Sequence, residues 1–310
     1  MILLYLLIAA LVILICGLWF AYHTAFRRDP RRQADMHEIP DDVQYVMHRD
    51  LMTENIKKLA AQPYERICVR SHDGLELVGK YYAGQPGKPV ILFFHGYRST
   101  GERDASGAFW YCRECGYSML MVDQRAHGES EGRTISFGIK ERYDCLTWVN
   151  EILRRFGSET EILLSGISMG GATVLMASEL DLPHQVKGIW ADCGFASPEE
   201  VLRESIRRKN WPESILYPLV SLSARFFGGF RVEERTALEA VRHAKIPILL
   251  IHGEDDRIVP CHMAYALRDA CASPVTLLTV PGAAHGVSYY MDKESYWKAL
   301  DTIFSTTFSQ

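Results

Sequence analysis

The chain begins with an unbroken apolar run. No Asp, Glu, Lys or Arg occurs between Met1 and Phe26. As a helix, which rises about 1.5 Å per residue, this run can cross a hydrocarbon core of about 30 Å. It lacks the basic start and the small-residue cleavage site of a signal peptide. We therefore predict a single-pass transmembrane helix over residues 1–26, with a buried helix of a soluble domain as the alternative.

Residues at the end of this run indicate its orientation. Trp19 and Tyr22 lie where aromatic side chains favour a membrane–water interface. Basic residues follow immediately, namely Arg27, Arg28, Arg31 and Arg32. Because positive charge tends to stay on the cytoplasmic side, we expect the rest of the chain to lie in the cytoplasm.

A polar segment with helical hydrophobic spacing occupies residues 27–62. Its apolar positions include Val43, Val46, Met47, Leu51, Ile56 and Leu59, and the pattern ends at Gln62-Pro63. This spacing predicts a connector helix that rests on the edge of a following domain. We expect that domain to occupy residues 63–310.

Short β-rich runs alternate with helical stretches from residue 63 onward. We place strands at 64–71, 75–82, 89–94, 118–123, 161–166, 188–192, 246–252 and 275–280. Runs such as Val90–Phe94 are apolar at every position, which is typical of strands buried on both faces. Asp73-Gly74 is a hairpin turn signal, so the first two strands should be antiparallel. The alternation predicts an α/β fold, a mostly parallel sheet with helices on both faces.

The alternation of strands and helices fails between residues 195 and 240. This stretch is rich in aromatic residues and arginine, including Trp211, Tyr217, Arg225, Phe226 and Phe227. The sheet pattern resumes only at Ile246. We interpret the stretch as a small helical lid inserted over the functional site.

Charge and cysteine usage narrow the possible functions. The 310 residues carry a net charge of −4, without the basic surface that nucleic acid requires. The eight cysteines are scattered singly, as expected of free thiols in a reducing compartment. Cys112 and Cys115 have metal-site spacing, but no second pair accompanies them. We expect no metal, no cofactor and no nucleic-acid partner.

A candidate nucleophile follows the strand at 161–166. Gly166-Ile-Ser168-Met-Gly170 stands between this strand and a helical stretch, the setting in which G-x-S-x-G places a serine on a sharp turn. Side chains at the two glycine positions would collide with neighbouring backbone. Ser168 would then sit at a helix N-terminus, which favours developing negative charge.

A serine nucleophile needs a base and an acid that orients the base. Both candidates occur in loops after later strands, at the carboxyl edge where ligands of such sheets bind. His285 follows the strand at 275–280, and an acidic cluster of Glu254, Asp255 and Asp256 follows the strand at 246–252. We predict His285 as the general base and Asp256 as the acid, with Asp255 as the rival.

Two loops carry further candidates. The backbone amides of Met169 and Tyr97 are the expected oxyanion donors, because Gly96 lets the loop after Phe94 turn inward. The Tyr97 side chain could alternatively pack under the lid. In the segment 123–130, we expect Asp123 and Arg125 to pair and brace the loops beside the site, without a direct catalytic role.

These motifs together resemble the α/β-hydrolase superfamily from about residue 63 to the end. The similarity is to the branch of monoacylglycerol-lipase-like, BEM46-like and serine-aminopeptidase-like serine hydrolases. The matching motifs are His95-Gly96, Asp123-x-Arg-x-His-Gly-x-Ser130, Gly166-x-Ser-x-Gly170, Asp256-x-x-Val-Pro260 and His285-Gly286. Ala126 departs from the family, which more often has Gly there. The resemblance implies an eight-stranded sheet with the second strand antiparallel and a cofactor-free acyl-enzyme mechanism.

We therefore expect a membrane-anchored serine hydrolase that cleaves carboxylic esters of small molecules, lipid-like acyl esters among them. A peptidase, an amidase or an acyltransferase on the same triad is the nearer alternative. A tethered scaffold that retains the fold without turnover is the alternative from another class.

Overall fold

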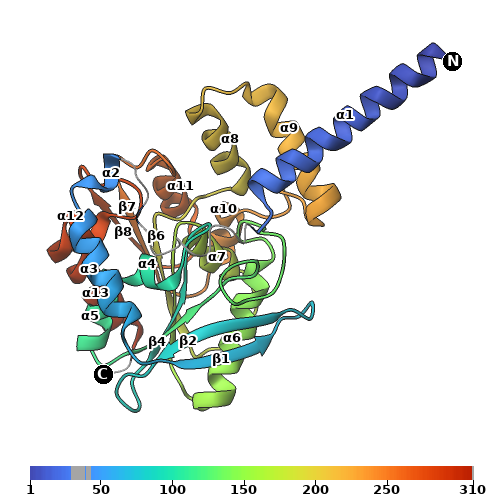
Figure 1. The fold of residues 1–310 in the computed structure, drawn as a ribbon. Coiled ribbons are helices and arrows are strands. Elements are labelled where there is room, and N and C mark those ends of the chain that lie inside the picture. Colours follow the sequence, from blue (N-terminus) through green and yellow to red (C-terminus); the bar gives the residue numbers. More distant parts are fainter. Residues whose placement is uncertain (29–38, 40–42, 309–310) are drawn as a thin grey trace.

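The computed structural model describes residues 1–28, 39 and 43–308. The apolar helix α1 (Ile2–Ala25) projects from a larger α/β body (Figure 1). Its length and mean hydropathy of 2.9 are sufficient to cross a membrane, and only its last third touches the body. Arg31 and Arg32 lie outside the described residues.

Eight strands form one sheet in the order β1-β2-β4-β3-β5-β6-β7-β8. Their bounds are β1 (Glu65–Arg70), β2 (Glu76–Tyr82), β3 (Val90–Phe94), β4 (Ser118–Val122), β5 (Ile162–Ile167), β6 (Val186–Asp192), β7 (Ile248–Gly253) and β8 (Val275–Val280). β2 pairs antiparallel with both β1 and β4, and all other pairs are parallel. The predicted strands and the antiparallel second strand are confirmed, and no strand end differs by more than two residues.

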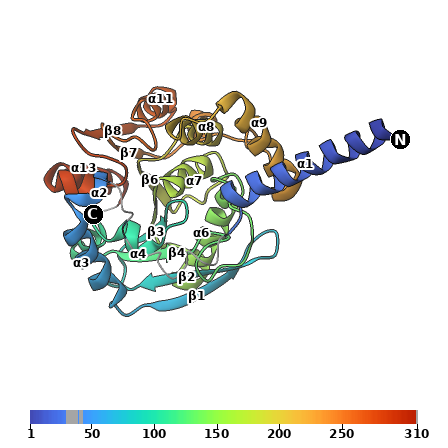
Figure 2. The same ribbon diagram turned by 45° about the horizontal axis from the view of Figure 1, so that its top comes forward.

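The sheet is buried on both faces because its central strands are apolar at successive positions. In β3, Val90, Leu92 and Phe94 face one hydrophobic cluster, whereas Ile91 and Phe93 face another. The helices α6 (Glu141–Phe156), α7 (Met169–Ala177) and α11 (His262–Ala270) contribute to the first cluster. The helices α4 (Gly101–Ala105), α5 (Phe109–Glu114) and α13 (Lys293–Thr307) contribute to the second (Figure 2). The layers are therefore helix, sheet, helix, as the strand pattern predicts.

The segment between α1 and the sheet contains two helices in its described part. These are the short α2 (Val43–Val46) and the longer α3 (Arg49–Ala60). Met52, Ile56 and Leu59 are the buried positions of α3, so its helical spacing serves packing. The described part of the connector therefore contains two helices separated at His48, where we predicted one. Residues 29–38 and 40–42 of the connector lie outside the described part.

Two helices of 11 residues each and three shorter helical elements separate β6 from β7. They are α8 (Pro198–Arg208), α9 (Glu213–Ser223), η2 (Ala224–Gly228), α10 (Ala237–Ala240) and η3 (Val241–His243). Ser197 starts α8 by accepting a hydrogen bond from the backbone amide of Glu200. α9 packs against the end of α1, and the two helices lie side by side in both views (Figures 1 and 2). We call α8, α9 and η2 the lid.

Candidate active site

Ser168 occupies a strained turn between β5 and α7. Its φ of 55° and ψ of −116° lie in a region that residues other than glycine rarely adopt. A Cβ on Gly170 would lie 1.9 Å from the carbonyl oxygen of Phe94, and one on Gly166 would lie 2.3 Å from the backbone of Gly170. Both glycines are thus required by close backbone contacts, and the turn holds Ser168 at the start of α7.

Three side chains distant in sequence are joined by hydrogen bonds at the carboxyl edge of the sheet. His285 Nε2 lies 3.0 Å from Ser168 Oγ, and His285 Nδ1 lies 2.7 Å from Asp256 Oδ2. Asp256 follows β7 and His285 follows β8. A neutral imidazole that donates from Nδ1 to the carboxylate leaves Nε2 as an acceptor for the serine hydroxyl. The arrangement can therefore remove a proton from Ser168.

Asp256 differs from its neighbour Asp255 in burial and in partners. Asp256 is buried, whereas Asp255 is exposed. The second carboxylate oxygen of Asp256 accepts hydrogen bonds from the backbone amides of Ile258 and Val259, at 2.8 and 2.9 Å. These two donors fix the carboxylate so that its other oxygen faces His285. The rival acid Asp255 points to solvent and makes no contact with the histidine in the described chain.

Burial and neighbouring charge shift the pKa values of Asp256 and His285 in opposite directions. Burial alone would raise the pKa of Asp256, but the nearby His285 and the hydrogen bonds from His252 and His285 hold it well below its usual range. Burial alone would lower the pKa of His285, but the charge and hydrogen bond of Asp256 outweigh burial and raise it. The carboxylate is therefore ionised, and the imidazole is a stronger base than a free histidine.

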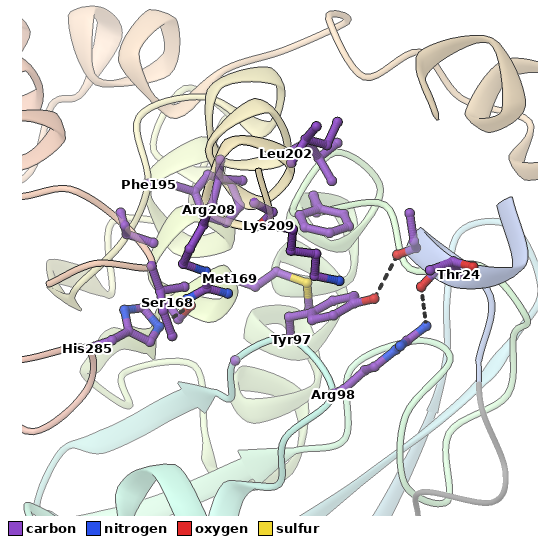
Figure 3. Close-up of a pocket in the computed structure, with 18 of the residues that line it drawn as sticks. Thr24, Tyr97, Arg98, Ser168, Met169, Phe195, Leu202, Arg208, Lys209 and His285 are labelled. Carbon is purple, nitrogen blue, oxygen red and sulfur yellow. Dashed lines mark hydrogen bonds between the residues drawn. The ribbon is translucent and has the colours of Figure 1, made fainter. Parts of the chain in front are cut away.

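The loop after β3 passes directly over Ser168. A Cβ on Gly96 would lie 3.4 Å from Ser168 Cβ. Tyr97 and Met169 line the same cavity as Ser168 and lie beside it (Figure 3). The Tyr97 hydroxyl donates to the carbonyl oxygen of Ala25 in α1, at 2.9 Å.

Two residues that the sequence did not single out as site residues hold this loop. Asp104 accepts hydrogen bonds from the Gly96 amide at 2.6 Å and from the Ser99 hydroxyl at 2.5 Å. The amide of Arg98, a residue with a φ of 52°, donates to His127 Nε2 at 3.0 Å. His127 belongs to the segment that we interpreted as a brace, but Asp104 lies in a short helix without a recognisable motif.

The expected pairing of Asp123 with Arg125 is wrong. The Arg125 guanidinium donates to Asp144 at 2.6 Å and to Asp73 at 2.8 Å. Asp123 instead accepts the backbone amide of Glu129. Ala126, which departs from the family glycine, has a φ of 63°, a conformation that costs less in glycine. The segment still braces neighbouring loops, but through acids contributed by the β1–β2 turn and by α6.

A cavity of about 680 Å³ opens in front of Ser168. This volume falls within the range of about 300–1,000 Å³ typical of small-molecule sites. Much of its apolar lining comes from the lid and from α1, and this part includes Phe20, Ala21, Val201, Leu202, Ile206, Leu216, Leu219 and Val220. The cavity can therefore receive an apolar group beside the Ser168 hydroxyl.

Positive charge predominates among the ionised residues around this cavity. Arg98, Arg103, Arg208 and Lys209 line it, together with the acidic Asp104. Arg208 and Lys209 follow one another at the end of α8 and extend from the lid toward Ser168 and Tyr97 (Figure 3). A substrate with a negative charge near its reactive carbonyl would meet complementary charge here.

Two clusters in the described chain bring metal-ligating atoms together, but the carboxylates of both clusters and His285 are already engaged. Cys193 lies beside Asp256 and His285, which bond to each other. Burial raises the pKa of the Cys193 thiol, so this group stays protonated. The other cluster contains Asp73 and Asp144, whose carboxylates bond to Arg125.

Comparison with known families supports the same fold. A family model described as the alpha/beta hydrolase fold matches residues 89–220, which include β3 to β6 and the nucleophile turn. A second model, described as serine hydrolase (FSH1), matches residues 219–287, which include the two loops that carry Asp256 and His285.

Two curated relatives share part of the chain. The uncharacterized protein YqkD of Bacillus subtilis is 28% identical over 60% of this chain and 62% of its own length. The lysophosphatidylserine lipase ABHD12 of Danio rerio is 27% identical over 62% of this chain and 50% of its own length. The chain thus spans less than two thirds of either relative.

A solved structure extends the comparison to most of the fold. The esterase Pf2001 of Pyrococcus furiosus superposes with a TM-score of 0.64 at 20% identity, covering 82% of this chain and 94% of that one. At 20% identity, the superposition shows a similarity of fold alone. Taken together, the eight-stranded sheet, the strand–turn–helix serine, the two family models and the curated relatives support an α/β-hydrolase fold of the serine-hydrolase type.

Proposed function

We propose that this protein is a membrane-anchored serine hydrolase that cleaves carboxylic esters with Ser168 as nucleophile, His285 as general base and Asp256 as the orienting acid. The observation that carries the proposal is the continuous hydrogen-bonded line from Asp256 through His285 to the Ser168 hydroxyl, facing an apolar cavity. This is the arrangement that turns an alcohol into a nucleophile.

The proposed reaction has two halves. In the first, Ser168 Oγ bonds to the ester carbonyl carbon while His285 Nε2 takes its proton; the amides of Met169 and Tyr97 stabilise the oxyanion. His285 then returns the proton to the leaving alcohol as the ester bond breaks. In the second half, His285 removes a proton from water, and the hydroxide attacks the acyl-enzyme. The acid is released, and Ser168 recovers its proton.

The cavity favours lipid-like acyl esters that carry a negative charge. Its lid and α1 walls are apolar, which suits an acyl chain, whereas Arg208 and Lys209 suit an anionic head group. The zebrafish relative is named a lysophosphatidylserine lipase, which supports this class of substrate.

Membrane attachment through α1 is part of the proposal. The helix contains no Asp, Glu, Lys or Arg, and its residues before Gly17 are exposed. Arg27 and Arg28 follow it, which favours a cytoplasmic catalytic domain by the positive-inside rule. The proposed organisation is an anchor at 1–26, a connector at 27–62 and a hydrolase domain at 63–310 with a lid near 195–240.

A substrate panel separates this proposal from its alternatives. The full-length protein and a Ser168→Ala variant are assayed against p-nitrophenyl esters, aminoacyl amides and an ester with an added alcohol acceptor. We expect Ser168-dependent release of free acid from the esters. Faster cleavage of amides would indicate a peptidase, transfer to the alcohol would indicate an acyltransferase, and equal inactivity of both folded proteins would indicate a scaffold.

A further inference from the structure

The proposed anchor helix also forms one wall of the catalytic cavity. Gly17, Phe20, Ala21, Thr24 and Ala25 line the cavity that contains Ser168. Their spacing of three and four residues places them on one face of α1. At about 1.5 Å per residue, this face borders the cavity over about 12 Å. An anchor that served only for attachment would not need to reach the active site.

The end of α1 is fixed to the loop that carries the proposed oxyanion donor. The Tyr97 hydroxyl donates to the Ala25 carbonyl oxygen at 2.9 Å. The Arg98 guanidinium donates to the carbonyl oxygen of Thr24 at 2.9 Å (Figure 3). It also donates to the carbonyl oxygen of Arg27 at 3.2 Å. These bonds satisfy carbonyl groups that a helix end leaves without partners, so the wall has a defined position.

Gly17 leaves an opening in this wall. A glycine inside a helix costs about 1 kcal/mol relative to alanine, so its presence calls for a local reason. Close packing is not that reason, because a Cβ at Gly17 would meet no other group of the described chain within 4 Å. The missing side chain instead widens the cavity where α1 borders it.

The outer face of α9 is apolar and continues to Phe226 of η2, beside the exposed Arg225. The sequence from Ser214 to Ala224 contains no charged residue. Ile215, Leu222 and Phe226 are exposed by 62%, 37% and 67%, and their spacing puts them on one continuous face. A helix that faces water normally presents polar residues there. This face therefore suits contact with hydrocarbon.

The packing of α9 and η2 against α1 indicates how deep these two elements lie. Both contact the last turns of α1. Trp19 of α1 packs against Phe227 of η2, with the ring centroids 5.2 Å apart, and Trp19 and Phe20 are still exposed by 45% and 72%. Exposed aromatic side chains of this kind suit the interface region of a membrane. If α1 enters the bilayer, α9 and η2, which pack along these turns, lie at the same depth.

We propose that α9 and η2 lie in the bilayer beside α1, and that the acyl chain of a membrane lipid ester enters the cavity sideways between α1 and the lid. Gly17 provides the space for the chain, and the cavity face of α1 guides the ester carbonyl toward Ser168. The hydrolytic part of this statement rests on the proposed function. The position of the lid in the bilayer does not.

A kinetic comparison tests whether α1 forms a wall of the cavity that admits the acyl chain. The full-length protein in phospholipid nanodiscs is assayed with p-nitrophenyl acetate and p-nitrophenyl palmitate. A Gly17→Phe variant should lower the palmitate-to-acetate ratio of kcat/KM at least tenfold, because the ring fills the opening. Ala10→Phe adds the same ring to an exposed position on the same helix and should keep the wild-type ratio. An unchanged ratio in Gly17→Phe would overturn the proposed wall.

A photolabelling experiment tests the depth of the lid without any turnover. A phospholipid with a diazirine in its acyl chain is activated in nanodiscs that hold the Ser168→Ala protein, and labelled peptides are mapped. We expect label on residues 213–228 as well as on α1. Label confined to α1 residues before Gly17 would overturn the lateral route. If the wild type cleaves neither ester, the hydrolase proposal fails and this second result still decides the position of the lid.

Discussion

Replacing Asp256 with asparagine should remove most of the activity while preserving the shape of the site. The asparagine oxygen can still accept the backbone amides of Ile258 and Val259, which lie 2.8 and 2.9 Å from the present carboxylate oxygen. Its amide group would then donate toward His285 Nδ1, where the carboxylate now accepts a bond of 2.7 Å. The imidazole must move its proton to Nε2, the atom that faces Ser168, and can no longer accept the serine proton.

The expected loss of activity follows from this change in the tautomer of His285. Loss of the base function in a serine triad by this type of substitution lowers kcat about 10⁴-fold, or about 5 kcal/mol of barrier. We expect a loss of that order in kcat/KM for p-nitrophenyl butyrate. Asp255→Asn is the matched control, because Asp255 is exposed one residue away, and it should retain activity within twofold.

The assay requires both variants to have the thermal stability of the wild type, so that lost activity reflects chemistry. A loss of less than tenfold in Asp256→Asn would refute the role of this residue as the orienting acid. An equal loss in Asp255→Asn would also refute it, because the effect would then belong to the loop and not to the buried carboxylate.

Three further changes have defined outcomes. Asp256 raises the pKa of His285, and the base must be neutral to act. The value of kcat/KM should therefore fall as the pH drops through a midpoint above the ordinary histidine pKa of about 6.5. A pH–rate profile with its acid midpoint below about 6.5 would contradict this expectation. Gly170→Ala places a Cβ 1.9 Å from the carbonyl oxygen of Phe94. This variant should lower the free energy of unfolding, measured by chemical denaturation, by about 3 kcal/mol or more. Gly17→Ala is the control, because a Cβ there meets open space and should not destabilise the protein. Arg208→Glu should lower kcat/KM at least tenfold for a lysophospholipid with an anionic head group relative to a neutral monoacylglycerol, and an unchanged ratio would exclude Arg208 from head-group binding.

The sequence predicts the sheet and the nucleophile turn well, for local reasons. Strands such as β3 are apolar at every position because both faces are covered, and that pattern is readable without coordinates. The glycines around Ser168 reflect backbone contacts that their spacing already implies. The choice between Asp255 and Asp256 depends on which carboxylate meets the backbone amides of the following loop, and only the folded loop answers it.

Features that depend on distant contacts could not be predicted. Arg125 stands beside Asp123 in sequence, yet it pairs with Asp73 and Asp144, which reach it only through the packing of the β1–β2 turn and α6. The contribution of α1 to the cavity is similar, because the helix is apolar on all sides and no stripe marks the face that meets the active site.

Active-site labelling tests the central claim most directly. The full-length protein is treated with a fluorophosphonate, and the modified residue is identified by peptide mass spectrometry. The triad predicts one adduct per chain, on Ser168, absent in Ser168→Ala and formed at least a hundredfold more slowly in His285→Ala. A folded wild-type protein that forms no adduct, or one that carries it on another residue, would contradict the assignment of Ser168 as the activated nucleophile.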